Sequence, residues 1–281
     1  MLARMELTDL ELPVFEPGWV WLVGAGPGDP ALLTLLALHA LRSADVVVYD
    51  ALVDSRVLAL APPTTNRIFA GKRGGKPSPT QRDISRRLIQ LARDGSRVLR
   101  LKGGDPLLFG RGVEEALALV EAAIPFRLVP GISAGLGGLA HAGIPLTHRE
   151  TNSAVTFVTG HVAGGDAPGH LNWPAIAHAS PVIVVYMPLK HIAEITGNLI
   201  AAGRAAHEPA AFVSKAATPD QHVVETTLAQ APDVARTIVP PALFVVGEVV
   251  RLRDGLDWLG ALGGRRLNAD PLGTRRRNDA G

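Results

Sequence analysis

The chain has 281 residues, of which 47% are hydrophobic and 19% charged, and its formal net charge is +2. This composition provides enough apolar material for a buried core and excludes a predominantly disordered chain. The absence of cysteine excludes disulfide scaffolds, thiolate metal sites and cysteine nucleophiles.

The N-terminal segment, residues 1–17, is acidic, with Arg4 set against Glu6, Asp9, Glu11 and Glu16. It has neither the cationic region nor the long apolar region of a secretory signal peptide. No stretch of the chain approaches about 18 uninterrupted apolar residues, the length that a membrane-spanning helix needs. We therefore expect a cytoplasmic protein that does not bind a membrane.

Strands and helices are predicted to alternate from residue 20 onward. Val20–Gly24 is a short apolar run that ends in glycine, as is typical of a buried parallel strand. Asp29 and Pro30 are suited to begin a helix, whose leucines continue to Leu41. Further strands are expected over 46–49, 97–101 and 126–129, with helices over 78–92 and 113–123. This alternation favours a mostly parallel sheet with helices on its outside.

A second series of elements begins after residues 148–152, where the helical pattern breaks. Strands are expected over 155–159, 181–186, 210–214, 223–227 and 243–247, and a helix over 189–202. We therefore predict an α/β protein with an N-terminal α/β domain over 18–147 and a C-terminal α/β domain over 153–263. A short N-terminal extension, 1–17, and an arginine-containing tail, 264–281, lie outside the two domains.

The loop Gly24-Ala-Gly-Pro-Gly-Asp-Pro30 follows a strand and precedes a helix, as a dinucleotide-binding loop does. Its third glycine comes one residue early, however, and Asp29 would repel a pyrophosphate at the helix N-terminus. Asp50 lies about 20 residues further on, where such folds place a ribose-binding acid. A nicotinamide-dependent oxidoreductase therefore stays open as an alternative, and so does a plain strand-to-helix turn.

Further glycine-rich and charged motifs are spread along the chain. They are Val48-Tyr-Asp50, Gly71–Pro79, Arg100–Pro106, Phe109–Gly112, Pro130–Ala134 and Gly143–Arg149. In order and spacing these motifs resemble those of the tetrapyrrole methylase family, and more narrowly its S-adenosylmethionine-dependent uroporphyrinogen-III C-methyltransferases. The resemblance runs from about Val20 to Asp257. It implies two α/β domains with a cofactor cleft between them, unlike a Rossmann methyltransferase.

The resemblance also implies S-adenosyl-L-methionine as the methyl donor and S-adenosyl-L-homocysteine as its product. We expect Gly103 and Gly104 to let the backbone approach the adenosyl group. Asp105 either binds the cofactor or caps the turn before Pro106, and Met187 either packs against adenine or belongs to the core. The cofactor contacts that the resemblance implies are Pro27, Gly103, Gly104, Asp105, Leu108, Ser133, Ala134, Met187 and Ala216.

The expected activity is C-methylation of uroporphyrinogen III at two ring carbons, giving precorrin-2 for cobalamin or sirohaem biosynthesis. Another precorrin methyltransferase of the same fold is the main alternative. The family places a proton acceptor at Asp50 and a proton donor at Lys72. The alternative roles are a turn cap for Asp50 and carboxylate binding for Lys72. A chain of 281 residues is not expected to contain an additional dehydrogenase/chelatase domain.

A substrate with eight carboxylates requires cations on nearby loops. The basic residues that we expect to bind it are Arg73, Lys76, Arg111 and Arg149. The nine histidines show no metal-ligand spacing, so no metal is predicted. The resemblance suggests a homodimer. Five arginines against two aspartates give the tail, 264–281, a net charge of +3, which we interpret as a solvated tail rather than a nucleic-acid site.

Overall fold

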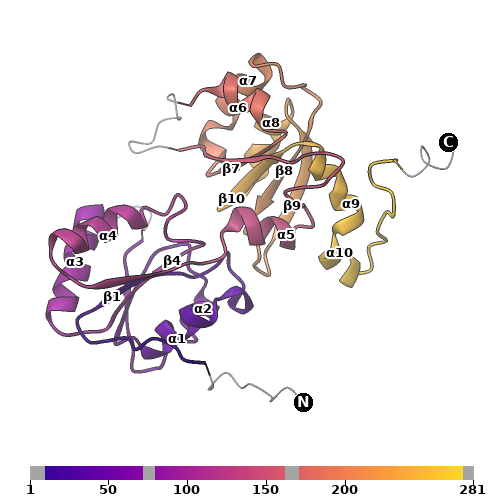
Figure 1. Cartoon of the computed structure of the whole chain (residues 1–281). Coiled ribbons are helices and arrows are strands. Elements are labelled where there is room, and N and C mark those ends of the chain that lie inside the picture. The colour runs from indigo at the N-terminus through magenta and orange to yellow at the C-terminus, as the bar shows by residue number, and fades with distance from the viewer. Residues whose placement is uncertain (1–9, 72–79, 162–170, 275–281) are drawn as a thin grey trace. The chain divides into compact units, whose positions relative to one another are not determined.

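The computed structural model describes residues 10–71, 80–161 and 171–274. The chain divides into two compact units, residues 1–132 and 133–281 (Figure 1). The sequence pattern instead placed the boundary at 148–152. The difference arises because Leu139, Ala142 and Ile144 are buried against the second sheet, so that this segment belongs to the second unit.

The first unit contains a fully parallel five-stranded sheet in the order β3-β2-β4-β1-β5. Since all strands run in one direction, all their carboxyl ends lie at one edge, where parallel sheets bind ligands. Strand β4 lies between β2 and β1, so the order differs from the 3-2-1-4-5-6 order of dinucleotide-binding sheets. The strands are β1 (Val20–Gly24), β2 (Val46–Tyr49), β3 (Asn66–Phe69), β4 (Val98–Lys102) and β5 (Phe126–Val129).

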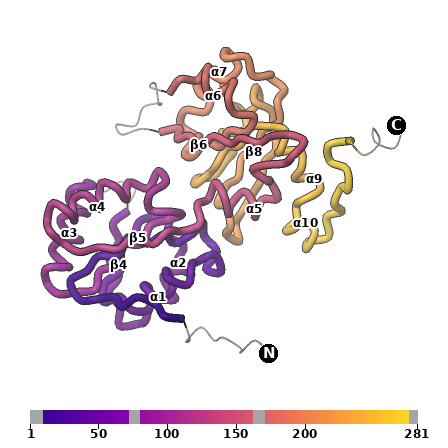
Figure 2. The backbone as a smooth tube through the Cα atoms, in the orientation of Figure 1, coloured from indigo at the N-terminus to yellow at the C-terminus, as the bar shows by residue number. Residues whose placement is uncertain are grey.

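Helices cover both faces of this sheet, with α1 and α2 on one side and α3 and α4 on the other (Figure 2). Strand alternation produces the two cores, because Trp21 and Val23 pack with α1 whereas Val20 and Leu22 pack with α3 and α4. The helices are α1 (Leu35–Ser43), α2 (Ser55–Leu58), α3 (Gln81–Arg93) and α4 (Gly112–Glu121).

The helix predicted after Asp29 is divided in two. The Asp29 side chain accepts a hydrogen bond from the Ala31 amide and caps a short 3-10 helix, Pro30–Leu32. Helix α1 begins only after Thr34, whose hydroxyl accepts from the Ala37 amide. Strand β3 was not predicted, since its first two residues, Asn66 and Arg67, are exposed and it lacks an apolar run.

The second unit contains a mixed five-stranded sheet in the order β6-β7-β10-β8-β9. Strands β6 and β7 are parallel, while β10 runs antiparallel to both β7 and β8. Therefore β6, β7 and β8 point the same way and end at the same edge. The strands are β6 (Val155–Thr159), β7 (Val182–Tyr186), β8 (Pro209–Ser214), β9 (His222–Thr227) and β10 (Ala242–Val246).

The second sheet also has a core on each face. Helices α6, α7 and α8 bury residues such as Trp173 and Ile195 on one face, and α5 buries Leu139 on the other. The helices are α5 (Leu139–His141), α6 (Trp173–Ala179), α7 (Ile192–Ala201), α8 (Ala231–Val234), α9 (Arg253–Leu256) and α10 (Trp258–Leu262), with a π-helical turn, Ala134–Gly138, before α5.

Four glycines, Gly24, Gly26, Gly104 and Gly131, bring the loops after β1, β4 and β5 into backbone contact. Gly26 and Gly104 exchange hydrogen bonds, with N–O distances of 3.2 Å and 2.7 Å. A Cβ atom on Gly131 would lie 2.2 Å from the carbonyl oxygen of Gly104, and one on Gly24 would lie 2.5 Å from that same oxygen. Glycine is required here because any side chain would separate the three loops.

We predict that Gly131→Ala lowers the free energy of unfolding by about 1–3 kcal/mol or more, since the neighbouring atoms are backbone and cannot move aside. The matched control is Gly197→Ala in α7, where a Cβ atom meets nothing within 4 Å. That change should raise the free energy of unfolding by about 0.5–1 kcal/mol. Chemical denaturation measures both, and equal stabilities for the two variants would contradict the packing argument.

Candidate functional site

The carboxyl edge of the first sheet carries a cluster of four charged side chains, which we call the buried ion cluster. It consists of Asp50, Arg100, Lys102 and Glu115. As predicted from the sequence, Asp50 directly follows β2. Arg100 and Lys102 lie two residues apart in β4 and therefore point to the same side of the sheet, toward α4, which supplies Glu115.

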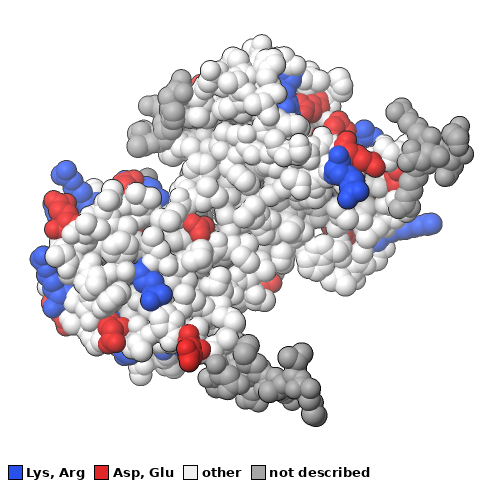
Figure 3. Space-filling view, viewed as in Figure 1, with Lys and Arg blue, Asp and Glu red and all other residues white. Residues whose placement is uncertain are grey.

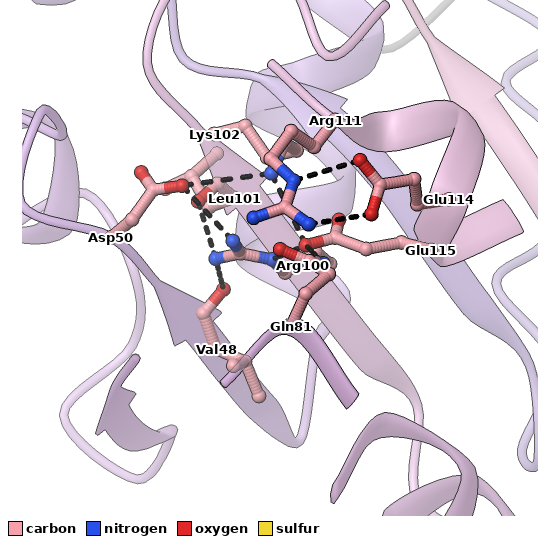
Figure 4. Close-up of polar contacts among 9 residues, drawn as sticks. All are labelled: Val48, Asp50, Gln81, Arg100, Leu101, Lys102, Arg111, Glu114 and Glu115. Atoms are coloured by element: carbon pink, nitrogen blue, oxygen red, sulfur yellow. Dashed lines mark hydrogen bonds and ion pairs between the residues drawn. The ribbon is translucent and has the colours of Figure 1, made fainter. Parts of the chain in front are cut away.

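Both cations of the cluster contact both carboxylates (Figure 4). Arg100 places Nη2 3.0 Å from Asp50 Oδ2 and Nε 3.1 Å from Glu115 Oε1. Lys102 Nζ lies 3.2 Å from Glu115 Oε1 and 3.6 Å from Asp50 Oδ2. Gln81, from α3, donates to the same Glu115 oxygen at 2.9 Å. The four charges form one closed network rather than two separate pairs.

Burial raises the free-energy cost of holding these four charges, because water solvates them less. The side chain of Glu115 is 0% exposed and that of Arg100 is 2% exposed, whereas Asp50 retains 26%. Burial lowers the pKa of Lys102, the charge of Arg100 lowers it further, and Glu115 and Asp50 oppose the shift. Two buried carboxylate oxygens, Asp50 Oδ1 and Glu115 Oε2, have no hydrogen-bond partner among the described residues.

The sequence did not predict a site role for Arg100, Lys102 or Glu115. A signal was present, because two cations alternate with leucines in a strand that is otherwise apolar. Charged side chains in a buried strand are rare unless they are paired. What the sequence did not indicate was the partner, since Glu115 comes from a helix.

The predicted substrate-binding residues fall in three different places. Arg111 begins α4 in a left-handed conformation, with φ of 60°, and forms two hydrogen bonds with Glu114 at 2.8 Å and 2.6 Å. Arg149 is exposed in a turn of the second unit. Lys72, Arg73 and Lys76 lie outside the described residues.

On the face in view in Figure 3, the described charged residues of the first unit are of mixed sign. Over α3 and α4, basic and acidic side chains are interspersed (Figure 3). The pair formed by Arg111 and Glu114 is 54% exposed at each side chain, and exposed pairs of this kind contribute roughly 0–1 kcal/mol. Arg111 can therefore exchange Glu114 for another carboxylate at low cost.

Asp105 joins the loop after β4 to the loop after β5. Its Oδ1 accepts from the Leu107 amide at 2.8 Å, and its Oδ2 accepts from the Gly131 amide at 3.1 Å. These two hydrogen bonds give Asp105 a structural role in joining the two loops. Gly103 and Gly104 also have structural reasons within the chain. A Cβ atom on Gly103 would lie 2.7 Å from Leu52 Cβ, and Gly104 has a left-handed φ of 66°.

Two other expected cofactor residues lie at the same edge. Pro27 follows the bridge between Gly26 and Gly104 and is half-buried. Leu108 is also half-buried, and the next residue, Phe109, has a left-handed φ of 52° and is 38% exposed. Left-handed backbone at a non-glycine residue is strained and is often found at functional sites.

Four expected cofactor residues of the second unit, Ser133, Ala134, Met187 and Ala216, lie near the edge where β7 and β8 end. Tyr186, at the end of β7, binds the segment that carries Ser133 and Ala134. The Ser133 hydroxyl is 2.6 Å from the Tyr186 hydroxyl, which also accepts from the Gly135 amide at 2.8 Å. Ala134 opens the π-helical turn, a feature frequent at functional sites. Tyr186 was not predicted, although it is a polar aromatic residue at the end of an apolar strand.

Met187 and Ala216 differ in their exposure. Met187 directly follows Tyr186, is 47% exposed and has a left-handed φ of 53°, so it does not belong to the core. Ala216 is 8% exposed and packs against Gly138, where a Cβ atom would lie 2.6 Å from its own Cβ. Its neighbours Lys215 and Ala217 both have positive φ values, of 45° and 56°. The strained residues of this unit thus gather after β7 and β8.

Within residues 10–71, 80–161 and 171–274, no group of three or more histidine, aspartate or glutamate side chains is placed to hold a metal ion. Across those same ranges, no helix has both the length and the apolar character needed to cross a membrane.

Comparison with known proteins connects these features to one family. Residues 20–232 match the family model for Tetrapyrrole (Corrin/Porphyrin) Methylases. The chain is 66% identical over 266 residues to a uroporphyrinogen-III C-methyltransferase from Sinorhizobium sp, covering 94% of this chain and 95% of that one. It is 48% identical to a siroheme synthase from Sodalis glossinidius over 86% of this chain, and it spans 51% of that longer protein.

Among solved structures, it resembles the crystal structure of uroporphyrin-III C-methyl transferase from Thermus thermophilus complexed with S-adenyl homocysteine. The TM-score is 0.73 and the sequence identity 42%, over 83% of this chain and 99% of that one.

We predict that Asp105→Ala lowers the free energy of unfolding by about 1–3 kcal/mol, since it removes a charged acceptor from two backbone amides. Asp105→Asn keeps the size and one acceptor oxygen, so its loss should be smaller. Thermal and chemical denaturation of both variants measure this order. An alanine variant as stable as the parent would contradict the role of Asp105 in joining the two loops.

Proposed function

Because the chain belongs to the tetrapyrrole methylase family, we propose that it is a uroporphyrinogen-III C-methyltransferase. It transfers methyl groups from S-adenosyl-L-methionine to two ring carbons of uroporphyrinogen III and so forms precorrin-2. The observation that carries this proposal is the 66% identity to a relative of that name, extending over nearly the full length of both chains. The siroheme synthase matches over about half of its own length, so only the methyl-transfer activity is proposed from it.

The residues proposed to bind S-adenosyl-L-methionine have properties that suit it. Gly103, Gly104 and Ala134 are small, so that their backbone N–H and C=O groups can approach a nucleoside and form hydrogen bonds with it. Leu108 and Met187 offer partly exposed apolar surface, which suits an adenine ring. S-adenosyl-L-methionine, when bound, supplies an electrophilic methyl group on a sulfonium. Pro27, Asp105, Ser133 and Ala216 complete the proposed set, with Asp105 and Ser133 acting through the backbone that they hold in place.

The chemistry left to the chain is alignment, exclusion of water and proton removal. Methylation of a pyrrole carbon leaves a cationic ring system that must lose a proton. Asp50 is suited to accept it, since Oδ2 is engaged by Arg100 and Lys102 while Oδ1 has no partner among the described residues. Lys72, which lies outside the described residues, is the proposed proton donor.

The substrate carboxylates call for cations that are available on loops. We assign this role to Arg73, Lys76, Arg111 and Arg149. Of these, Arg111 and Arg149 are exposed, and Arg111 is bound only by a surface carboxylate, Glu114, in the part of the chain described. A guanidinium can bind a carboxylate through two parallel hydrogen bonds, which gives direction as well as charge.

The proposal includes a homodimer that acts in the cytoplasm. An exposed apolar row on α4 supports association, since Val113, Leu117 and Val120 are each more than half exposed and lie on one face of the helix. The charged, water-soluble nature of both substrates supports the cytoplasm as the place of the reaction.

The proposed activity predicts a product that has gained two methyl groups, both on carbon. The experiment incubates the protein with uroporphyrinogen III and methyl-labelled S-adenosyl-L-methionine, followed by mass measurement and carbon NMR. Methylation on oxygen or nitrogen, or no transfer to this acceptor, would contradict the assignment. Transfer only to a later precorrin would instead favour a different methyltransferase of the same fold.

A second experiment separates catalysis from binding at Asp50. Asp50→Asn removes the base and keeps its size, so we expect turnover to fall about 10²–10⁴-fold with little change in S-adenosyl-L-homocysteine affinity. The matched control is Asp45→Asn at the other end of β2, where Asp45 pairs with Arg97 at 2.6 Å. The control should lose some stability and keep its turnover per folded molecule. An Asp50→Asn variant within about threefold of the parent would reduce Asp50 to a structural role.

A further inference from the structure

Glu115 is the most deeply buried member of the ion cluster. Its side chain is 0% exposed, whereas Asp50 is 26% exposed. A fully buried carboxylate is costly unless its partners compensate for it. Its Oε1 receives three donors, from Arg100, Lys102 and Gln81, while Oε2 has none among the described residues.

The two cations connect Glu115 to Asp50. In Figure 4, Asp50 lies on one side of Arg100 and Lys102, and Glu115 lies on the other. Arg100 uses Nε for Glu115 and Nη2 for Asp50, so the planar guanidinium fixes one carboxylate relative to the other. Lys102 also contacts both Glu115 and Asp50, through its single ammonium group. Moving or neutralising Glu115 must therefore change how both cations meet Asp50.

We infer that Glu115 is a positioning residue, which acts through Arg100 and Lys102 to hold Asp50 Oδ2 and leave Oδ1 as the proton-accepting atom. This inference rests on the proposed function, in which Asp50 takes the proton released after methylation. Glu115 itself contacts no substrate in this assignment. Its effect is on the orientation and the charge of the environment of Asp50.

The charges of the cluster predict in which direction the titration of Asp50 moves when one of them is removed. The cluster contains two cations and two carboxylates. Removing the charge of Glu115 leaves two cations facing Asp50, which stabilises the ionised form of Asp50 and makes it a weaker base. Removing the charge of Lys102 leaves one cation facing two carboxylates, which has the opposite effect. The two changes must therefore move the titration of Asp50 in opposite directions.

The other described groups near the cluster do not provide the same connection. Gln81 from α3 is neutral, and within the described residues its side chain donates to Glu115 alone. Arg111 and Glu114, at the start of α4, pair with each other. The pKa of Glu114 is lowered chiefly by its hydrogen bonds to Arg111, and the charge of Lys102 contributes less. Lys72, proposed as the proton donor, lies outside the described residues and is kept unchanged in every variant.

The first test follows the titration of Asp50 by NMR of protein labelled with ¹³C at the aspartate carboxyl carbon. The Asp50 signal is assigned by its absence in Asp50→Asn. Relative to the parent, Glu115→Gln should move the midpoint to lower pH, and Lys102→Met should move it to higher pH. The double variant, Glu115→Gln with Lys102→Met, restores one cation against one carboxylate and should return the midpoint toward the parent value. This readout does not depend on turnover.

The second test measures the pH dependence of kcat with uroporphyrinogen III and S-adenosyl-L-methionine. Glu115→Gln should lower kcat at least tenfold, leave KM for both substrates within about threefold, and move the acid limb to lower pH. Glu115→Asp keeps the charge with a shorter reach, so it should restore the acid limb and recover only part of kcat. Comparison with the parent cancels the titration of the substrate's own carboxylates.

Asp45→Asn is the matched control, because it removes a carboxylate from the ion pair at the opposite end of the same two strands. It should leave the Asp50 midpoint and the acid limb unchanged even if stability falls. If Glu115→Gln does not fold, Lys102→Met still tests the direction in which the Asp50 midpoint moves when a charge of the cluster is removed. Folded variants whose Asp50 midpoint matches the parent would overturn the inference, whereas a parent without turnover would overturn the proposed function alone.

Discussion

Two cations in the middle strand of a parallel sheet must be neutralised away from water, and much of the first unit follows from that constraint. Arg100 and Lys102 are almost fully buried in β4, which lies between β2 and β1. Burying unpaired charges costs several kcal/mol or more per ion. The strand order places Asp50, which follows β2, next to these cations. Helix α4 packs over the same face of the sheet and provides Glu115. The cluster therefore fixes β2, β4 and α4 with respect to one another.

The same edge of the sheet also brings backbone groups together. Gly24, Gly104 and Gly131 let the loops after three neighbouring strands touch, and Asp105 joins two of those loops through their amides. Such contacts join the three loops without filling the edge with side chains. Loops joined in this way suit a methyltransferase, because one of its main tasks is to align two substrates. The glycines thus serve the site by shaping it, whether or not they touch a ligand.

The second unit arrives at a comparable arrangement by different means. There the Tyr186 hydroxyl hydrogen-bonds to the Ser133 hydroxyl and to the Gly135 amide at the start of the π-helical turn. The residues with strained backbone, Met187, Lys215 and Ala217, follow the ends of β7 and β8. Strained backbone persists only where the surrounding structure holds it in place. The strands β7, β8 and β10, which are buried except for one residue each, provide that support.

The sequence by itself determined the alternation of strands and helices, the existence of two α/β units, the position of Asp50 after its strand and the family. These features are local, since an apolar run, a cap or a glycine motif is readable within a few residues. It placed the boundary between the units too late, because burial of Leu139 and Ile144 against the second sheet is not a local property. Tertiary structure alone decided that Arg100 and Lys102 share Glu115, that Asp105 binds the Gly131 amide and that Tyr186 holds Ser133. Each of these contacts joins residues 13 to 53 positions apart, and which partner lies opposite depends on strand order and helix packing rather than on the spacing of residues along the chain.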